Sequence, residues 1–156
     1  MRKSIDKVLG MLLIVLMSVL IIDVMWQVIS RYVLAHPSSF TDEIAGYLLV
    51  WVGLLGAAYV AGEKEHLAID LLLQRSKGRT RMVIEMIIYT ITGLFVLFVL
   101  VIGGTNLVYT RFLLHVTSAS LELNLGYVYL VLPISGILTL YYTIDNARKT
   151  LNSDNK

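Results

Sequence analysis

Four long apolar runs constrain the fold of this chain more than any other feature. A membrane-spanning helix needs about 20 mostly apolar residues, and a soluble domain of this size could not bury a chain that is 57% hydrophobic. The runs cover residues 8–31, 44–61, 82–109 and 125–144. We therefore predict an all-α membrane protein. Its four transmembrane helices form one small bundle, a single domain over residues 1–151, followed by a polar, disordered tail at 152–156.

The basic residues predict the orientation of these spans. The first run is too long for a signal peptide and no A-x-A site follows it, so it counts as a span. All lysines and arginines except Arg31 and Arg111 lie at the N-terminus, between the second and third runs, or in the tail. Because basic residues are enriched in cytoplasmic loops, we expect both termini to be cytoplasmic. The loops at about 32–43 and 111–126 then face outward.

The segment HLAIDLLLQR, residues 66–75, is too short to span. On a helix its polar residues at every fourth position would form one stripe, and the basic residues beyond it would lie beside anionic headgroups. We expect a short interfacial helix here, with a simple turn as the alternative. The outward segment 117–126 is an extended stretch or a short surface helix, and periodicity does not decide between them.

The first span carries Asp23, Gln27 and Arg31, spaced four apart and therefore on one helix face. An ionisable group at this depth should face protein or water rather than lipid. Two readings stay open: Asp23 belongs to a proton or ion relay, or this face makes hydrogen bonds between helices or to a partner protein. We favour the second, because Glu85 is the only other acid within a predicted span.

The second span carries a stripe of small residues. Gly46, Val50, Gly53, Ala57 and Ala61 follow helical spacing and form a smooth surface that another helix can approach closely. Ordinary packing within the chain would produce the same pattern. A tryptophan in the middle of the span, away from the membrane interface, favours an external partner.

A cap-like sequence precedes the same span. Pro37 ends the previous element, Thr41 is the predicted N-cap, and Asp42 and Glu43 fall in the first turn. These acids face outward with His36, either as helix caps or as a surface for a soluble partner. In the fourth span Pro133 predicts a kink.

Catalytic and metal-binding motifs are missing from the sequence. There are no cysteines, which excludes disulfides and thiolate metal sites. His36 and His115 are predicted outside and His66 inside, so they do not converge on a metal. There is no G-x-S-x-G and no phosphate-binding glycine loop. We expect no enzyme activity and no cofactor, and the net charge of +2 gives no basis for nucleic-acid binding.

Several stretches together resemble a known family. They are ISRYVL at 29–34, FTDEIAGYLLVWVGLLGAAY at 40–59, EHLAIDLL at 65–72 and, more weakly, SASLELNLGYVYLVLPISG at 118–136. The chain resembles the small membrane subunit (Q, or DctQ-like) of tripartite ATP-independent periplasmic (TRAP) transporters. The resemblance implies four spans in a bacterial inner membrane, with both termini cytoplasmic.

The resemblance also implies partners. A large multi-span M subunit would carry the transport domain and the sodium sites, and a periplasmic P subunit would deliver a small organic acid such as a C4-dicarboxylate or sialic acid. The Q subunit would support M and help to dock P. On this reading the candidate M contacts are Asp23, Gln27, Arg31, Gly46, Trp51, Gly53, Gly56 and Ala57. The candidate P-docking rim is His36, Asp42 and Glu43, and the candidate interfacial turn and lipid contacts are His66, Asp70, Arg75, Arg79 and Arg81.

Two other functions compete with this one. A self-sufficient four-helix exporter would use Asp23 as its proton-coupled carboxylate and would transport without a partner. A membrane enzyme would need catalytic groups clustered on one side, and the sequence offers no such cluster. The motif set favours the accessory subunit.

Overall fold

The computed structural model describes residues 2–36, 38–63 and 79–154. They form helices α1 (Arg2–Tyr32), α2 (Ser39–Glu63), α4 (Arg79–Phe95), η1 (Val96–Gly103), α5 (Gly104–Leu113), α6 (Leu125–Tyr129) and α7 (Val131–Asp154). The segments α4, η1 and α5 run on from one another and make the third span. Four helical stretches are long and apolar enough to cross a membrane. The all-α, four-span prediction is confirmed for this part of the chain.

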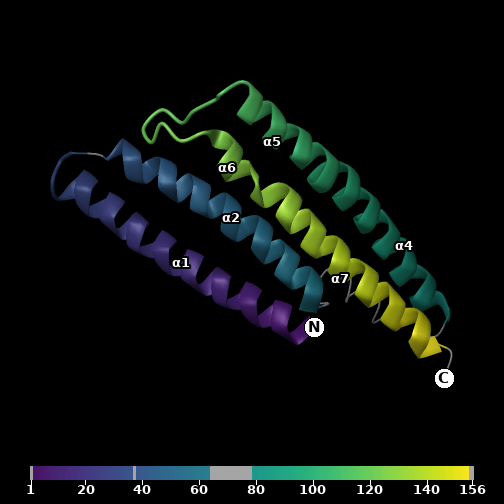
Figure 1. Cartoon of the computed structure of the whole chain (residues 1–156). Helices are drawn as coiled ribbons and strands as arrows, with labels where there is room; N and C mark the ends of the chain where they lie inside the picture. Colours follow the sequence, from purple (N-terminus) through teal and green to yellow (C-terminus); the bar gives the residue numbers. More distant parts are fainter. Residues whose placement is uncertain (1, 37, 64–78, 155–156) are drawn as a thin grey trace.

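The four spans lie side by side in one open layer, in the order α1, α2, α7 and third span (Figure 1). The helix α2 packs between α1 and α7, and α7 packs between α2 and the third span. The two described ends of the chain lie at the same end of the layer (Figure 1), as an even number of spans requires. The four-helix bundle is therefore open, not closed. Lipid is as apolar as leucine, so no hydrophobic force drives such helices to close around a common core.

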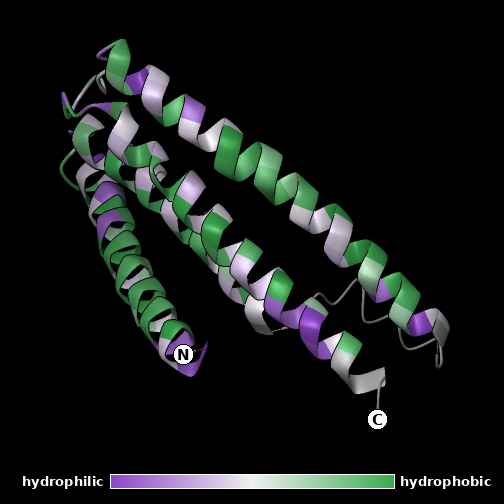
Figure 2. Cartoon of the chain, turned by 45° about the vertical axis from the view of Figure 1, so that its right-hand side comes forward, coloured by the Kyte–Doolittle hydropathy of each residue, from purple (hydrophilic) through white to green (hydrophobic). Residues whose placement is uncertain are grey.

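The edge helices leave most of their apolar surface uncovered. In α1 the buried residues are Leu9 and Ser30, and strongly apolar residues run along all of the spans (Figure 2). The buried cluster is small and lies where α1, α2 and α7 meet, with Leu9, Leu55, Val131 and Tyr142 at its centre. A layer one helix thick exposes both of its broad faces to lipid or to another protein.

The third span contains an eight-residue π-helix, Val96–Gly103, which the sequence analysis did not predict. The third span packs closely against α7 at Gly104, the first residue of α5, and at Gly136 of α7. A Cβ on Gly104 would lie 2.8 Å from the Leu132 Cβ, and one on Gly136 would lie 2.9 Å from a Val101 methyl and 3.0 Å from the Leu100 Cβ. The two helices approach this closely only because neither position carries a side chain.

Pro133 interrupts the fourth span as predicted. The break falls at Leu130, between α6 and α7. Proline has no N–H to donate to the carbonyl of Tyr129, four residues earlier, so the regular hydrogen bond is missing at that turn. The interruption lies next to the close contact at Gly104, whose Cβ would also come within 3.3 Å of the proline ring.

Two local predictions need correction, and a third point left open by the sequence is answered. The helix α2 begins at Ser39, so Thr41 is not the cap; its hydroxyl lies within the first turn and donates to the Ser38 carbonyl at 3.0 Å. The helix α7 continues to Asp154, so the helix extends into the expected tail. The segment 117–126, for which an extended stretch and a surface helix were both open, turns back on itself through an isolated bridge between Thr117 and Asn124, and α6 begins at Leu125.

Candidate functional site

The polar face of α1 meets the start of α2 at the end of the layer away from the two chain termini. We call this the outward end and the other the inward end, after the orientation predicted from the basic residues. The Gln27 amide donates to the Asp23 carboxylate at 3.0 Å and to the Thr41 carbonyl at 2.9 Å. Asp23 and Gln27 are both half-buried. The geometry is that of a hydrogen-bonded link between two helices, with the Gln27 amide joining Asp23 of α1 to the backbone of α2.

The third member of that face, Arg31, forms an ion pair with Asp42 at 3.3 Å. Both side chains are about half exposed, so the pair contributes little to stability. His36 lies in the loop between α1 and α2 and is exposed. Asp42 and His36 are therefore accessible at the outward rim.

Glu43 has a different environment from Asp42. One carboxylate oxygen accepts a hydrogen bond from the Ser118 hydroxyl at 2.7 Å, and the other accepts from the Ser120 backbone N–H at 3.1 Å. Ser118 is buried. Glu43 thus ties the outward loop, residues 114–124, to the start of α2, and its carboxylate is already engaged within the chain.

The small-residue stripe of α2 is largely uncovered. Gly46, Val50, Gly53 and Ala57 are exposed, whereas Ala61, at the inward end, is buried. A Cβ placed on Gly46, Gly53 or Gly56 would meet nothing within 4 Å. Within the described chain these glycines serve no close helix contact, in contrast to Gly104 and Gly136.

Trp51 points into the layer. Its indole N–H donates to the Val128 carbonyl of α6 at 3.1 Å, and its ring packs against the buried cluster. This bond satisfies the one polar atom of the side chain at mid-span. Any partner contact of Trp51 would involve the exposed part of its ring alone.

The inward end carries a polar network that was not predicted from the sequence. Arg2 donates to Asp145 at 2.7 Å, to Asn146 at 3.1 Å and to the Gly62 carbonyl. Tyr142 donates to Asp6 at 2.6 Å. The network joins the first turns of α1 to the end of α2 and to α7. The sequence contains a pattern that could have predicted this network. Arg2 and Asp6 are spaced four apart near the start of the first span, and Asp145 and Lys149 are spaced four apart near the end of the fourth.

Most of the predicted interfacial turn lies outside the described residues, namely His66, Asp70 and Arg75. Arg79 is the first residue of α4. Arg81 pairs with Glu85 at 3.0 Å, and Glu85 also accepts from the Thr150 hydroxyl at 2.9 Å. The latter bond links α4 to α7 near the inward end.

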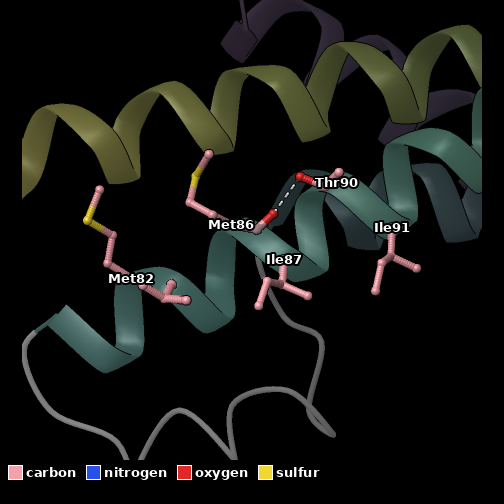
Figure 3. A pocket seen from close by; sticks show the side chains of 6 residues that line it. Met82, Met86, Ile87, Thr90 and Ile91 are labelled. Atoms are coloured by element: carbon pink, nitrogen blue, oxygen red, sulfur yellow. Dashed lines mark hydrogen bonds between the residues drawn. The ribbon is translucent and has the colours of Figure 1, made fainter.

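A groove of about 470 Å³ lies on α4 (Figure 3). Met82 and Met86 reach toward α7, while Ile87 and Ile91 point the other way (Figure 3). The Thr90 hydroxyl donates to the Met86 carbonyl at 2.8 Å. The groove presents apolar side chains and one hydroxyl that is already hydrogen-bonded. Such a lining does not suit a polar substrate.

The described residues contain no group of three or more His, Asp or Glu side chains that could hold a metal ion. The polar clusters lie at the two ends of the layer and join helices to one another. Their hydroxyls and carboxylates bond to one another across helices and loops, as in the bonds of Ser118 to Glu43 and of Tyr142 to Asp6.

Comparison with known proteins shows which protein family this chain is similar to. The family model described as "Tripartite ATP-independent periplasmic transporters, DctQ component" matches residues 19–152. A protein of Haemophilus influenzae described as "Putative TRAP transporter small permease protein" is 32% identical over 71 residues. That alignment covers 46% of this chain and 44% of the relative, so the chain spans less than half the length of the relative that it matches.

Proposed function

The chain belongs to the DctQ component family of tripartite ATP-independent periplasmic transporters, and from this premise we propose that it supports a larger membrane subunit. The observation that carries the proposal is the open layer. Four helices side by side enclose no path of their own. A layer of this kind is suited to enlarging and anchoring the stationary part of a transporter.

The partner face in this proposal is the exposed stripe of α2. Small residues let helix backbones approach closely in a membrane, and Gly46, Gly53 and Ala57 are exposed together on one helix. The open space beyond these glycines is what an incoming helix of the M subunit would fill. Gln27 and Arg31 would border this contact at its outward end.

A tagged pull-down from native membranes in mild detergent tests the proposal. We expect a multi-span membrane protein of several hundred residues to co-purify with the wild-type chain, and Gly53→Leu to reduce its yield several-fold. Thr90→Leu is the control, because it adds bulk at an exposed position of the third span, at one edge of the layer. Equal recovery with Gly53→Leu would remove the stripe from the interface, and the absence of any large membrane partner would remove the supporting role.

Docking of a periplasmic P subunit is proposed at the outward rim, with His36 and Asp42 as its exposed groups. Glu43 holds the chain's own outward loop, so a double reversal of both acids would confuse docking with loop damage. The sharper test is Asp42→Lys alone, in uptake measured over a range of P concentrations. We expect a higher P concentration for half-maximal uptake, and an unchanged requirement would leave Asp42 as a helix-end charge.

The remaining expectations follow the family. We propose an inner-membrane location with both termini cytoplasmic, sodium-coupled import of a small organic acid, and substrate specificity residing in P and M.

The competing exporter would require Asp23 to carry protons. Asn at position 23 retains a hydrogen-bond acceptor for Gln27, so Asp23→Asn should leave uptake by the assembled transporter within about two-fold. Complete loss, with the complex intact, would favour the proton-coupled alternative.

A further inference from the structure

Arg111 stands out among the cations at the outward end. The other one, Arg31, is paired with Asp42, whereas no acid pairs with Arg111 in the part of the chain that the structure describes. Its Nε atom is buried without a hydrogen-bond partner. The guanidinium carbon lies 5.7 Å from the centre of the Tyr129 ring, which fixes the side chain by a cation–π contact. The cation is held in place while its charge is left uncompensated.

An open groove of about 400 Å³ runs along α5 beside this arginine. It is lined by Gly103, Asn106, Leu107, Thr110 and Arg111. Gly103, Leu107 and Arg111 are spaced four apart, so they follow one another along one helix face. The groove begins two residues before the outward end of α5 and extends about 12 Å toward the membrane centre.

The polarity of the groove changes with depth. The charge of Arg111 and the Thr110 hydroxyl lie outermost, the Asn106 amide lies one turn deeper, and the glycine lies deepest. This is the order of the groups in a phospholipid: a phosphate, then the ester-linked glycerol, then the acyl chains. A glycine at the deep end leaves room for a chain to lie against the backbone.

We propose that this groove binds a single outer-leaflet phospholipid with a net negative headgroup. The Arg111 guanidinium donates to the phosphate, because charge-assisted bonds from arginine to phosphate are strong and geometrically defined. The Thr110 hydroxyl donates to the Asn106 amide oxygen at 3.4 Å, so the amide nitrogen of Asn106 is the group that can donate to the lipid. The Asn106 amide donates to a glycerol ester carbonyl, and an acyl chain covers Leu107 and Gly103. The proposal does not depend on the transporter role.

Native mass spectrometry of the full chain, purified with the membrane subunits that accompany it, tests this site. The protein is equilibrated in mixed micelles containing phosphatidylglycerol or phosphatidylcholine. We expect one phosphatidylglycerol to be retained in preference to phosphatidylcholine. Because a basic residue near a charged membrane surface contributes about 1 kcal/mol, Arg111→Gln should weaken retention about five-fold or more. Arg111→Lys should keep the preference.

The matched control is Arg31→Gln, which removes the same charge at the same end but from an existing ion pair. It should leave lipid retention within about two-fold. Asn106 is exposed, so Asn106→Leu removes its hydrogen bond from Thr110 without disturbing buried packing, and it should weaken retention even if Arg111→Gln fails to fold. Equal retention by wild type, Arg111→Gln and Asn106→Leu would overturn the proposal. So would a photo-crosslinker at Thr110 that captures a membrane protein instead of lipid.

Discussion

A methyl group at Gly104 should weaken the contact between the third span and α7. The added Cβ would lie 2.8 Å from the Leu132 Cβ and 3.3 Å from both the nitrogen and the Cδ of Pro133. None of these atoms can turn aside, since each is fixed to the backbone of α7. The helices would have to move apart by nearly 1 Å to restore ordinary contact near 3.5–4.0 Å.

The expected cost follows from two opposing terms. Overpacking a tight contact costs about 1–3 kcal/mol, and alanine in place of glycine within a helix returns up to about 1 kcal/mol. Gly104→Ala should therefore destabilise the chain by about 1–2 kcal/mol. Titration from mild detergent into denaturing detergent, followed by circular dichroism, measures this difference.

Two further variants make the test specific. A Cβ on Gly93 would meet a Thr143 methyl at 4.0 Å, an ordinary contact, so Gly93→Ala should be neutral or slightly stabilising. Gly136→Ala should resemble Gly104→Ala. The double variant at 104 and 136 should cost less than the sum, because one separation of the helices relieves both clashes. If Gly104→Ala is as stable as Gly93→Ala, the close contact does not limit helix approach as argued.

Three other perturbations give distinct outcomes. Tyr142→Phe removes the 2.6 Å hydrogen bond to Asp6 and should cost about 1–2 kcal/mol in the same detergent titration; an unchanged midpoint would show that the bond adds no net stability. Glu43→Ala releases the outward loop, so amide hydrogens of that loop should exchange faster, while exchange at the inward end stays as in the wild type. Pro133→Ala supplies the N–H that the Tyr129 carbonyl lacks; a slowly exchanging amide at position 133 is expected, and rapid exchange there would contradict the assigned cause of the break.

The position of the four spans could be predicted from the sequence, and the reason is the bilayer. Hydrocarbon of fixed thickness requires long apolar helices with all backbone groups satisfied internally, so the runs appear directly in the residue order. The spacing of Asp23 and Gln27 likewise predicted a shared face, and that face makes a helix-to-helix link. Pro133 predicted an interruption because its missing N–H is a local property.

The roles of the two outward acids could not be separated in the same way. Asp42 and Glu43 are neighbours in one helical turn and have similar chemistry, yet one pairs with Arg31 on the surface and the other holds a loop from residue 118 onward. The difference comes from a segment 75 residues away in the chain. Local pattern carries no information about such a partner.

The sequence by itself determined that this chain has four membrane-spanning helices and which family it resembles. The tertiary structure decided which helices are neighbours, that they form an open layer, and which glycines support close contacts. Gly53 looked like a packing position and is exposed, whereas Gly104 and Gly136, which were not predicted as helix contacts, form the tight contact. The physical reason is that lipid and protein interiors are equally apolar, so hydrophobicity does not distinguish a lipid-facing side from a packed one. The fit between neighbouring helix surfaces does distinguish the two sides, and that fit exists only once the helices are packed together.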